Sequence, residues 1–297
     1  MRRLKEDIGI IVLSLLIAAV SASYFLGFLQ REKEAETQDL YYLLPSQPKS
    51  VLAINQPTAF VHLLLEKTPG MDILQRWIPE AFLYLLRQEP ETPFLLFSFH
   101  QEGVICYAKA NKKQAEKLEH NILRTYFSAY EPQEEILHDI RFRYYADTGS
   151  RFLGCYQHEG VWVASYSKRL LEQVVRKQLL PQEQSDEDEL SPFFRQFDRN
   201  ATANLLFPSD GWQIQVARHD TILWKYNLPW VCTDLFPSEG NICGFCSFPY
   251  AVPNDSLYEA MGDSLAIQLE ALFPRLHVTP QTSQDSSEVY FTFCSPL

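Results

Sequence analysis

The hydrophobic pattern of the chain begins with one long apolar stretch. Residues 8–29 contain no charged side chain. In a helix with a rise of about 1.5 Å per residue, this stretch reaches roughly 33 Å, which is enough to cross a hydrocarbon core of about 30 Å. A lone segment in lipid satisfies its backbone hydrogen bonds as a helix. The pattern therefore predicts a transmembrane signal-anchor helix at residues 8–29, preceded by a stub at residues 1–7.

A cleaved signal peptide is the alternative interpretation of the same stretch. Arg2, Arg3 and Lys5 would form its basic region, and the Val-Ser-Ala sequence at residues 20–22 would supply small side chains at a cleavage site. The apolar stretch continues past that site as far as Leu29. This continuation favours a helix that is retained as an anchor.

The charges that flank the stretch predict its orientation. Three basic residues precede it, and two, Arg31 and Lys33, follow it closely. Because cytoplasmic flanks carry the excess of Lys and Arg, we expect the N-terminus in the cytosol and the bulk of the chain outside it. The short stub suits a bacterial inner membrane. We therefore expect a single-pass protein that faces the periplasm and meets the lipid bilayer through residues 8–29.

Beyond a juxtamembrane linker at residues 30–48, short apolar runs alternate with amphipathic stretches. Strands are predicted at residues 51–54 and 136–145, and helices at residues 57–67 and 72–87. Together with the elements described next, they predict an α+β domain at residues 49–183. We expect an antiparallel sheet in this domain, with the helices on one face.

Two stretches of this domain resemble each other. They span about residues 94–129 and 151–180 and align without a gap at an offset of 57. Each consists of an apolar strand, a Glu-Gly turn (positions 102–103 and 159–160), a second apolar strand and a helix. Glycine supplies the positive φ angle that a tight hairpin requires. We interpret the pair as a duplicated β-hairpin–helix unit.

Both units end in an amphipathic helix. Asn111 and Ser167 are the expected N-caps. In the second helix, apolar residues recur at spacings of three and four: Leu170, Leu171, Val174, Val175 and Leu179. This spacing produces one apolar stripe, which suits a helix that covers a sheet.

An acidic segment marks the predicted end of the first domain. Residues 184–200 form an acidic linker and a short helix, and the run at residues 186–189 consists only of Asp and Glu. This run lacks the glycine and the alternating oxygen ligands of a calcium loop, so we interpret it as a solvated linker. Residues 201–297 are richer in strands and contain one predicted helix at about residues 255–272.

The composition limits the partners of the chain. Apolar residues make up 46% and aromatic residues 13%, so the part beyond the anchor can build a core. The formal net charge is −11. An acidic surface repels phosphate backbones, which argues against nucleic acid as a partner.

One motif in the chain is typical of a known activity. The sequence Cys243-Gly-Phe-Cys246 matches a thiol oxidoreductase motif, and Cys243 and Cys246 are the redox candidates. The motif lies in an apolar run that predicts a strand, and in a strand a separation of three puts two side chains on opposite faces. Structural use of these thiols is therefore favoured. The chain has six cysteines, which permit one or two disulfides in an oxidising compartment, but the sequence does not indicate their pairing.

Other familiar sites lack support in the sequence. The seven histidines form no zinc-protease pattern, and no nucleophile elbow, phosphate-binding loop or dinucleotide fingerprint occurs. We therefore assign no catalytic, cofactor-binding or metal-binding residue. The leading hypothesis is a membrane-anchored, extracytoplasmic, non-enzymatic module that binds or scaffolds another envelope component, for example an envelope protein. The alternatives are a carrier or sensor of a lipid-like apolar ligand, and a thiol oxidoreductase.

Overall fold

The computed structural model describes the chain in ten segments: residues 39–66, 71–88, 94–120, 126–127, 131–179, 190–218, 221–238, 241–247, 277–280 and 291–294, with the single positions 21 and 23. At positions 72–73, 192, 209–229 and from 238 onward, only the backbone is described. The predicted span at residues 8–29 (apart from those two positions), most of the acidic linker and the predicted helix at 255–272 lie outside these segments. Among the described helices, none combines the length and apolar character needed to cross a bilayer.

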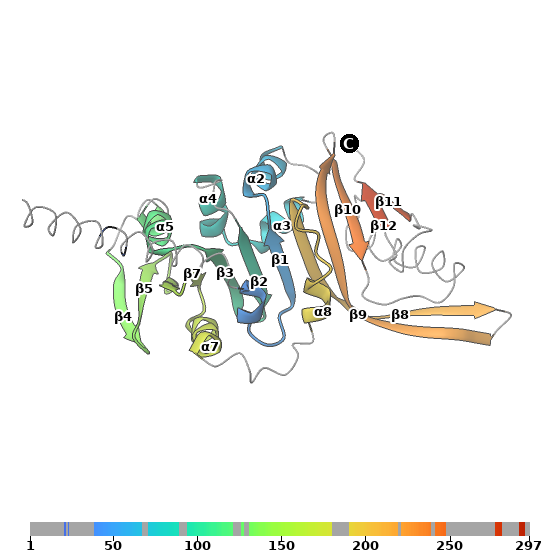
Figure 1. Cartoon of the computed structure of the whole chain (residues 1–297). Coiled ribbons are helices and arrows are strands. Elements are labelled where there is room, and N and C mark those ends of the chain that lie inside the picture. The colour runs from blue at the N-terminus through green and yellow to red at the C-terminus, as the bar shows by residue number, and fades with distance from the viewer. Residues whose placement is uncertain are drawn as a thin grey trace, which may run out of the picture.

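The described strands form one antiparallel sheet of 12 strands (Figure 1). They are β1 (Ser50–Ile54), β2 (Leu95–His100), β3 (Gly103–Lys109), β4 (Gln133–Leu137), β5 (Ile140–Ala146), β6 (Phe152–His158), β7 (Val161–Ser165), β8 (Ala203–Arg218), β9 (Thr221–Ser238), β10 (Asn241–Ser247), β11 (His277–Pro280) and β12 (Phe291–Cys294). Their order across the sheet is β11-β12-β10-β9-β8-β1-β2-β3-β7-β6-β5-β4. This arrangement confirms an α+β protein with a large antiparallel sheet.

The helices cover both faces of the sheet, so the expectation of helices on one face is wrong. Helices α2 (Pro57–Leu65), α3 (Met71–Trp77), α4 (Glu80–Gln88) and α5 (Lys112–Leu118) contribute to one apolar cluster. The 3-10 helix η1 (Leu40–Leu43), α7 (Lys168–Leu179) and α8 (Ser191–Phe194) contribute to the other. Figure 1 shows α2, α4 and α5 on one side of the strands and α7 and α8 on the opposite side.

The central strands explain why both faces need a cover. Every residue of β1 and of β7 is buried. In β1, Leu52 and Ile54 join the cluster under α2 to α5, whereas Val51 and Ala53 join the cluster under α7. A strand that is apolar at successive positions has no face to offer to water. The runs at residues 51–54 and 161–164 therefore favour a sheet sandwiched between two helical layers.

All elements of the two predicted hairpin–helix units form, but the units are not spatial copies. Strands β2 and β3 form one hairpin, β6 and β7 form the other, and β3 pairs with β7. Helix α5 follows the first hairpin on one face, and α7 follows the second hairpin on the other. A rotation that superposes the hairpins leaves these helices on opposite sides.

Relative to the sequence alignment at an offset of 57, the turn of the second hairpin is shifted by one residue, and this shift accounts for the reversal. In the first hairpin, His100 pairs with Gly103, so the turn lies at positions 101–102. In the second, His158 pairs with Val161, so the turn is Glu159-Gly160, with φ angles of 44° and 77°. A slip of one residue moves every side chain to the other face of a sheet. Residues that align at the offset of 57 therefore lie on opposite faces of the sheet. The helices that follow the two hairpins, α5 and α7, lie on opposite faces as well.

The predicted helix starts are confirmed. The Asn111 side chain accepts a hydrogen bond from the backbone N–H of Gln114, and the Gln114 side chain accepts one from the Asn111 N–H, both at 2.9 Å. These two bonds form a capping box. At α7, the Ser167 hydroxyl oxygen accepts a hydrogen bond from the backbone N–H of Leu170 at 3.3 Å.

The strands of the second half continue the same sheet. Strand β8 pairs with β1 on one side and with β9 on the other. The apolar runs at residues 203–207, 212–217, 221–226 and 230–235 predict four short strands, but the structure has two long ones, β8 and β9, of 16 and 18 residues. The register shifts between Pro208 and Trp212, where residues 209–211 oppose Pro229 alone. A bulge of this kind bends a strand without ending it.

Candidate functional site

The outer halves of β8 and β9 form a two-stranded ribbon beyond the bulge, which we call the outer ribbon (residues 212–218 and 221–228). It projects away from the helices and the other strands (Figure 1). At about 3.3 Å per residue, its arms reach roughly 20 Å. Among the described strands, β8 and β9 pair over this stretch only with each other.

The backbone register of the outer ribbon separates apolar from polar residues. Three cross-strand pairs are apolar: Trp212 with Leu228, Ile214 with Tyr226, and Val216 with Trp224. The two pairs between them are polar: Gln213 with Asn227, and Gln215 with Lys225. Successive pairs of an antiparallel ribbon lie on alternate faces. The ribbon therefore has one apolar face, rich in aromatic residues, and one polar face.

The outer ribbon also differs from the rest of the chain in charge. From residue 212 to residue 228 the hairpin contains two basic residues, Arg218 and Lys225, and one acidic residue, Asp220, whereas the whole chain carries a net charge of −11. A locally basic and amphipathic element attracts anionic surfaces that the rest of the protein repels.

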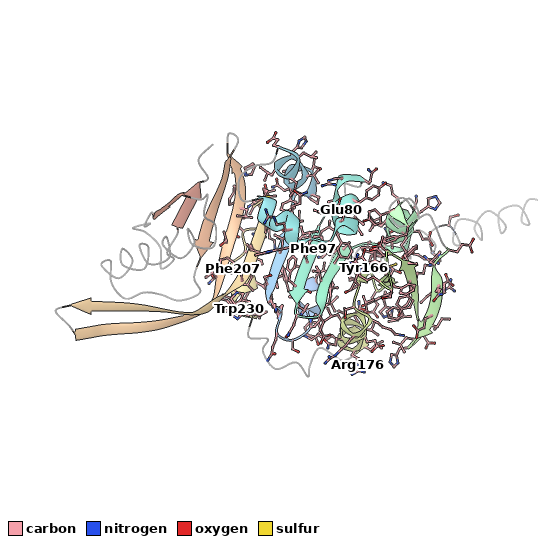
Figure 2. The ribbon with its side chains drawn as sticks, turned by 180° about the vertical axis from the view of Figure 1, so that it is seen from behind. Glu80, Phe97, Tyr166, Arg176, Phe207 and Trp230 are labelled. Atoms are coloured by element: carbon pink, nitrogen blue, oxygen red, sulfur yellow. The ribbon has the colours of Figure 1, made fainter. Side chains whose placement is uncertain are left out.

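The ribbon begins at a well-packed base. Phe207 belongs to the apolar cluster on one side of the sheet, and Trp230 packs against the cluster on the other. Figure 2 shows both side chains where β8 and β9 leave the body. Pro208 pairs with Trp230 immediately before the bulge. The ribbon thus extends from a part of the sheet that is covered on both faces.

A buried polar network ties this base to β1. Asn204 Nδ2 donates to Asp234 Oδ1 at 2.6 Å and to the Asp198 carbonyl at 2.9 Å. Asn55 Nδ2 donates to Asn204 Oδ1 at 2.6 Å and to the Ala201 carbonyl at 3.0 Å. Burial raises the pKa of the Asp234 carboxyl from 3.8 to about 6, although the hydrogen bonds from Asn204 and from the Asp198 N–H oppose the rise. The network joins three neighbouring strands and the loop before β8.

A second candidate site is a cleft of about 400 Å³ at the other end of the sheet, between β4, β5, β6 and the start of α7. Lys168 Nζ donates to both carboxylate oxygens of Glu135, at 2.9 and 2.7 Å. The same ammonium lies 5.7 Å from the centroid of the Tyr144 ring. The Tyr166 hydroxyl donates to Asp147 Oδ2 at 2.9 Å. Polar side chains of this cleft are therefore engaged with one another.

The acid–base state of the cleft does not suit proton transfer near neutral pH. The hydrogen bond from Lys168 lowers the pKa of the Glu135 carboxyl. Burial raises the pKa of the Tyr144 and Tyr166 hydroxyls above their ordinary value. These three groups therefore keep one protonation state over the physiological range, whereas a general acid or base works best with a pKa near that range.

The predicted redox pair lies in a regular strand. Cys243 and Cys246 both belong to β10, where they pair with Phe236 and Thr233 of β9. Their odd separation in a continuous ladder places the two residues on opposite faces. The structure does not bring them together, and thiol redox use of the pair stays a prediction.

Three further cysteines are buried in the body. Cys106, Cys155 and Cys232 take part in no disulfide, and burial raises the pKa of the Cys106 and Cys155 thiols well above the ordinary value. A thiol that stays protonated is a poor nucleophile and a poor metal ligand. Among the described residues, no group of three His, Cys, Asp or Glu side chains is arranged to hold a metal ion.

The sequence contains signals for these features, but a single strand does not show which residues its partner brings beside it. The alternation in the residues from Trp212 to Ala217 indicates an amphipathic strand, but its partner strand and the register decide which residues share a face. Likewise, Cys294 pairs with Cys243 across β12 and β10, although 51 positions separate them in the chain. Only the sheet order connects these two residues.

Comparisons with known proteins add little to this picture. No protein-family model matches the chain, and no curated protein matches it in sequence. Crystal form I of the protein TP0453 has a similar structure, with a TM-score of 0.44 and 11% identity over 86% of this chain and 91% of that one. Crystal form III of the same protein gives a TM-score of 0.43 and 8% identity, over 86% and 93%. Neither value supports an inference about function.

Proposed function

We propose that this protein is a membrane-anchored, extracytoplasmic module without catalytic activity, and that it binds the surface of an anionic lipid bilayer through its outer ribbon. The predicted anchor at residues 8–29 tethers the chain to one membrane. The ribbon makes a second contact with a membrane. In this proposal, the envelope component that the protein binds is the surface of the bilayer. The observation that carries the proposal is the run of three apolar cross-strand pairs that alternate with polar ones.

The kinds of residue on the apolar face favour a bilayer interface. Trp212, Trp224 and Tyr226 are three of the six residues that the register places on it. Amphipathic aromatic rings concentrate at the level of lipid headgroups, where one part of the ring is buried in apolar surroundings and another is hydrated. Aliphatic neighbours such as Ile214 add apolar area that can leave water on contact with acyl chains.

The charge of the ribbon favours an anionic surface in particular. Arg218 and Lys225, less Asp220 between the two arms, give the hairpin a charge of about +1, and each basic residue near an anionic leaflet contributes about 1 kcal/mol of attraction. This attraction falls off within a Debye length, so it acts only on residues close to the surface. The rest of the chain is acidic and is repelled by anionic headgroups. The protein therefore meets the membrane surface with its ribbon.

The cleft between β4, β5, β6 and α7, whose polar side chains pair with one another, supports a function without catalysis. Lys168 neutralises Glu135, and the hydroxyls of the half-buried Tyr144 and Tyr166 stay protonated near pH 7. A binding module needs a stable scaffold and an exposed contact surface, and it needs no titrating group.

Tryptophan fluorescence tests the proposal on the full-length chain. The protein is reconstituted in vesicles of phosphatidylcholine and phosphatidylglycerol whose acyl chains carry bromine, which quenches nearby tryptophan emission. The predicted anchor contains no tryptophan, so its insertion does not contribute to the signal. We expect quenching in the parent protein and loss of most of it in the double variant Trp212→Phe, Trp224→Phe. Vesicles without phosphatidylglycerol should give less quenching.

A matched control uses a tryptophan of the body. Trp77 on α3 is 38% exposed, and Trp77→Phe should leave the quenching unchanged. Equal quenching in the parent and the double variant would contradict the proposal. So would emission that is shielded from aqueous quenchers but insensitive to bromine, because that result assigns the apolar face to a protein partner or to a second copy of the chain.

A further inference from the structure

The edge of the sheet beyond β9 brings together two cysteines that are far apart in the sequence. Strand β10 pairs with β12, and β12 pairs with β11. In the β10–β12 ladder, Cys243 lies directly opposite Cys294, and Cys246 lies opposite Phe291. We propose that Cys243 and Cys294 form a disulfide that fastens β12 to β10.

The register meets the geometric requirement for a disulfide. Directly opposite residues of an antiparallel ladder have Cα atoms about 4.5 or 5.5 Å apart, depending on whether the pair is hydrogen-bonded. Disulfides join residues whose Cα atoms are about 4.4–6.8 Å apart. Both kinds of ladder position lie inside that interval, so the bond forms without a change of register.

The same registers exclude the other cysteines of the described strands. Cys106 and Cys155 both pair with Ala164, one from each side of β7, so a whole strand separates them. Cys232 lies opposite Leu206 and Ser247. None of these three cysteines takes part in a disulfide in the structure. Cys246 has no cysteine opposite it on β9 or β12.

The chemistry is ordinary thiol–disulfide exchange. One thiol, as the thiolate, attacks the disulfide of an oxidant and releases one reduced thiol. The second thiolate then attacks the mixed disulfide and releases the other. The two cysteines together lose two protons and two electrons, and the oxidant, a disulfide of the oxidised-glutathione class, becomes two thiols. The bond persists where the compartment is oxidising, so its presence in cells rests on the proposed extracytoplasmic location.

The inferred bond changes the meaning of the Cys-x-x-Cys motif. Cys243 is paired across the sheet with a residue near the C-terminus, and Cys246 is left single. Its first cysteine then serves to hold β12, a short strand of four residues next to the edge strand β11, in register. Among the described strands, β12 is also the only partner of β11, so the bond secures both.

Peptide mapping of the full-length protein tests the pairing in two arms. In the first, reduced protein is oxidised with oxidised glutathione, remaining thiols are blocked with N-ethylmaleimide, and the chain is cut with chymotrypsin without reduction. Cleavage after Leu235, Phe245 and Phe293 puts Cys232, Cys243, Cys246 and Cys294 on different peptides. We expect one linked pair, which joins the peptide of Cys243 to that of Cys294 and separates on reduction.

Variants make the assignment specific. Cys246→Ser should keep the linked pair, and Cys243→Ser should abolish it. A Cys243–Cys246 link, or maleimide on both Cys243 and Cys294 after oxidation, would overturn the pairing. The second arm repeats the mapping on protein trapped with acid directly from cells. A bond that forms with glutathione but is absent from cells would refute the oxidising location and leave the pairing intact, whereas the fluorescence experiment on the ribbon is independent of both.

Discussion

Adding a methyl group at Gly154 should destabilise the protein, because this residue lies in β6 directly beneath α7. A Cβ atom at position 154 would lie 2.7 Å from Leu171 Cδ1 and 2.9 Å from Tyr144 Cε1. Leu171 is fully buried in the cluster under α7, so it has little room to retreat. Distances below 3.0 Å force one of the neighbours to move.

The size of the effect follows from two opposing contributions. Inserting a methyl group into a well-packed core costs about 1–3 kcal/mol. Replacing glycine also restricts the unfolded chain, which stabilises the fold by about 0.4–1 kcal/mol. We therefore expect Gly154→Ala to lower the free energy of unfolding by about 1–2 kcal/mol.

A double-mutant cycle identifies the cause of that loss. Leu171→Ala alone should cost about 2–5 kcal/mol, because it leaves a cavity. In its background, Gly154→Ala should cost less, since the nearest obstructing atom is gone. Urea unfolding of the detergent-solubilised chain, followed by near-ultraviolet circular dichroism, provides the four stabilities. The packing argument fails if Gly154→Ala is as stable as the parent, or if its cost is the same in both backgrounds.

Three further predictions concern a helix cap, a buried carboxyl and the outer ribbon. Asn111→Ala removes the capping box of α5 and should lower the free energy of unfolding by about 1 kcal/mol in the same assay, and Asn111→Ser should restore most of it. Burial raises the pKa of Asp234 to about 6, so the fold favours the protonated carboxyl and loses stability as the pH rises through the window from 3.8 to about 6. The stability of Asp234→Asn relative to the parent should therefore be greater at pH 7 than at pH 4. Urea midpoints of the two proteins that change by the same amount between pH 4 and pH 7 would contradict this. On the ribbon, Ile214→Glu should reduce the quenching by brominated lipid, whereas Gln215→Glu, one residue away on the polar face, should reduce it much less; an equal effect of both would contradict the assigned faces.

The sequence was sufficient to predict the local helices, strands and turns. It was insufficient to predict on which face of the sheet each helix lies. Asn111 and Ser167 start helices where capping chemistry predicts, and Gly160 has the positive φ that its turn requires. The continuous apolar runs of β1 and β7 already indicated burial on both faces. The expectation of one helical face came from the general α+β pattern of strands and amphipathic helices. The alignment of the two hairpins at the Glu-Gly dipeptides does not correct it, because it hides the shift of one residue between the turns, which reverses the faces.

The candidate sites depend on long-range pairing, which a single strand pattern does not determine. The alternation after Trp212 is visible in the sequence, but the apolar face exists only because the register sets Trp212 opposite Leu228. That register follows from the bulge at residues 209–211; Pro208 and Gly211 are residue types that mark a bulge, but they do not specify how many residues it holds. The Cys243–Cys294 pair depends on the sheet order β10-β12-β11, in which a chain segment near the C-terminus returns beside an earlier strand.

Depth-resolved quenching of Trp212 and Trp224 is the most direct test of the membrane contact of the outer ribbon. Vesicles containing phosphatidylglycerol are prepared with bromine at a shallow or at a deep position of the acyl chain, and the parent is compared with the Trp212→Phe, Trp224→Phe variant. Because aromatic residues concentrate at the interface, the difference between the two proteins should be largest with shallow bromine and should shrink as salt screens the charges of the ribbon. No difference between brominated and plain vesicles would show that the ribbon does not meet the bilayer, and the proposed function would be wrong.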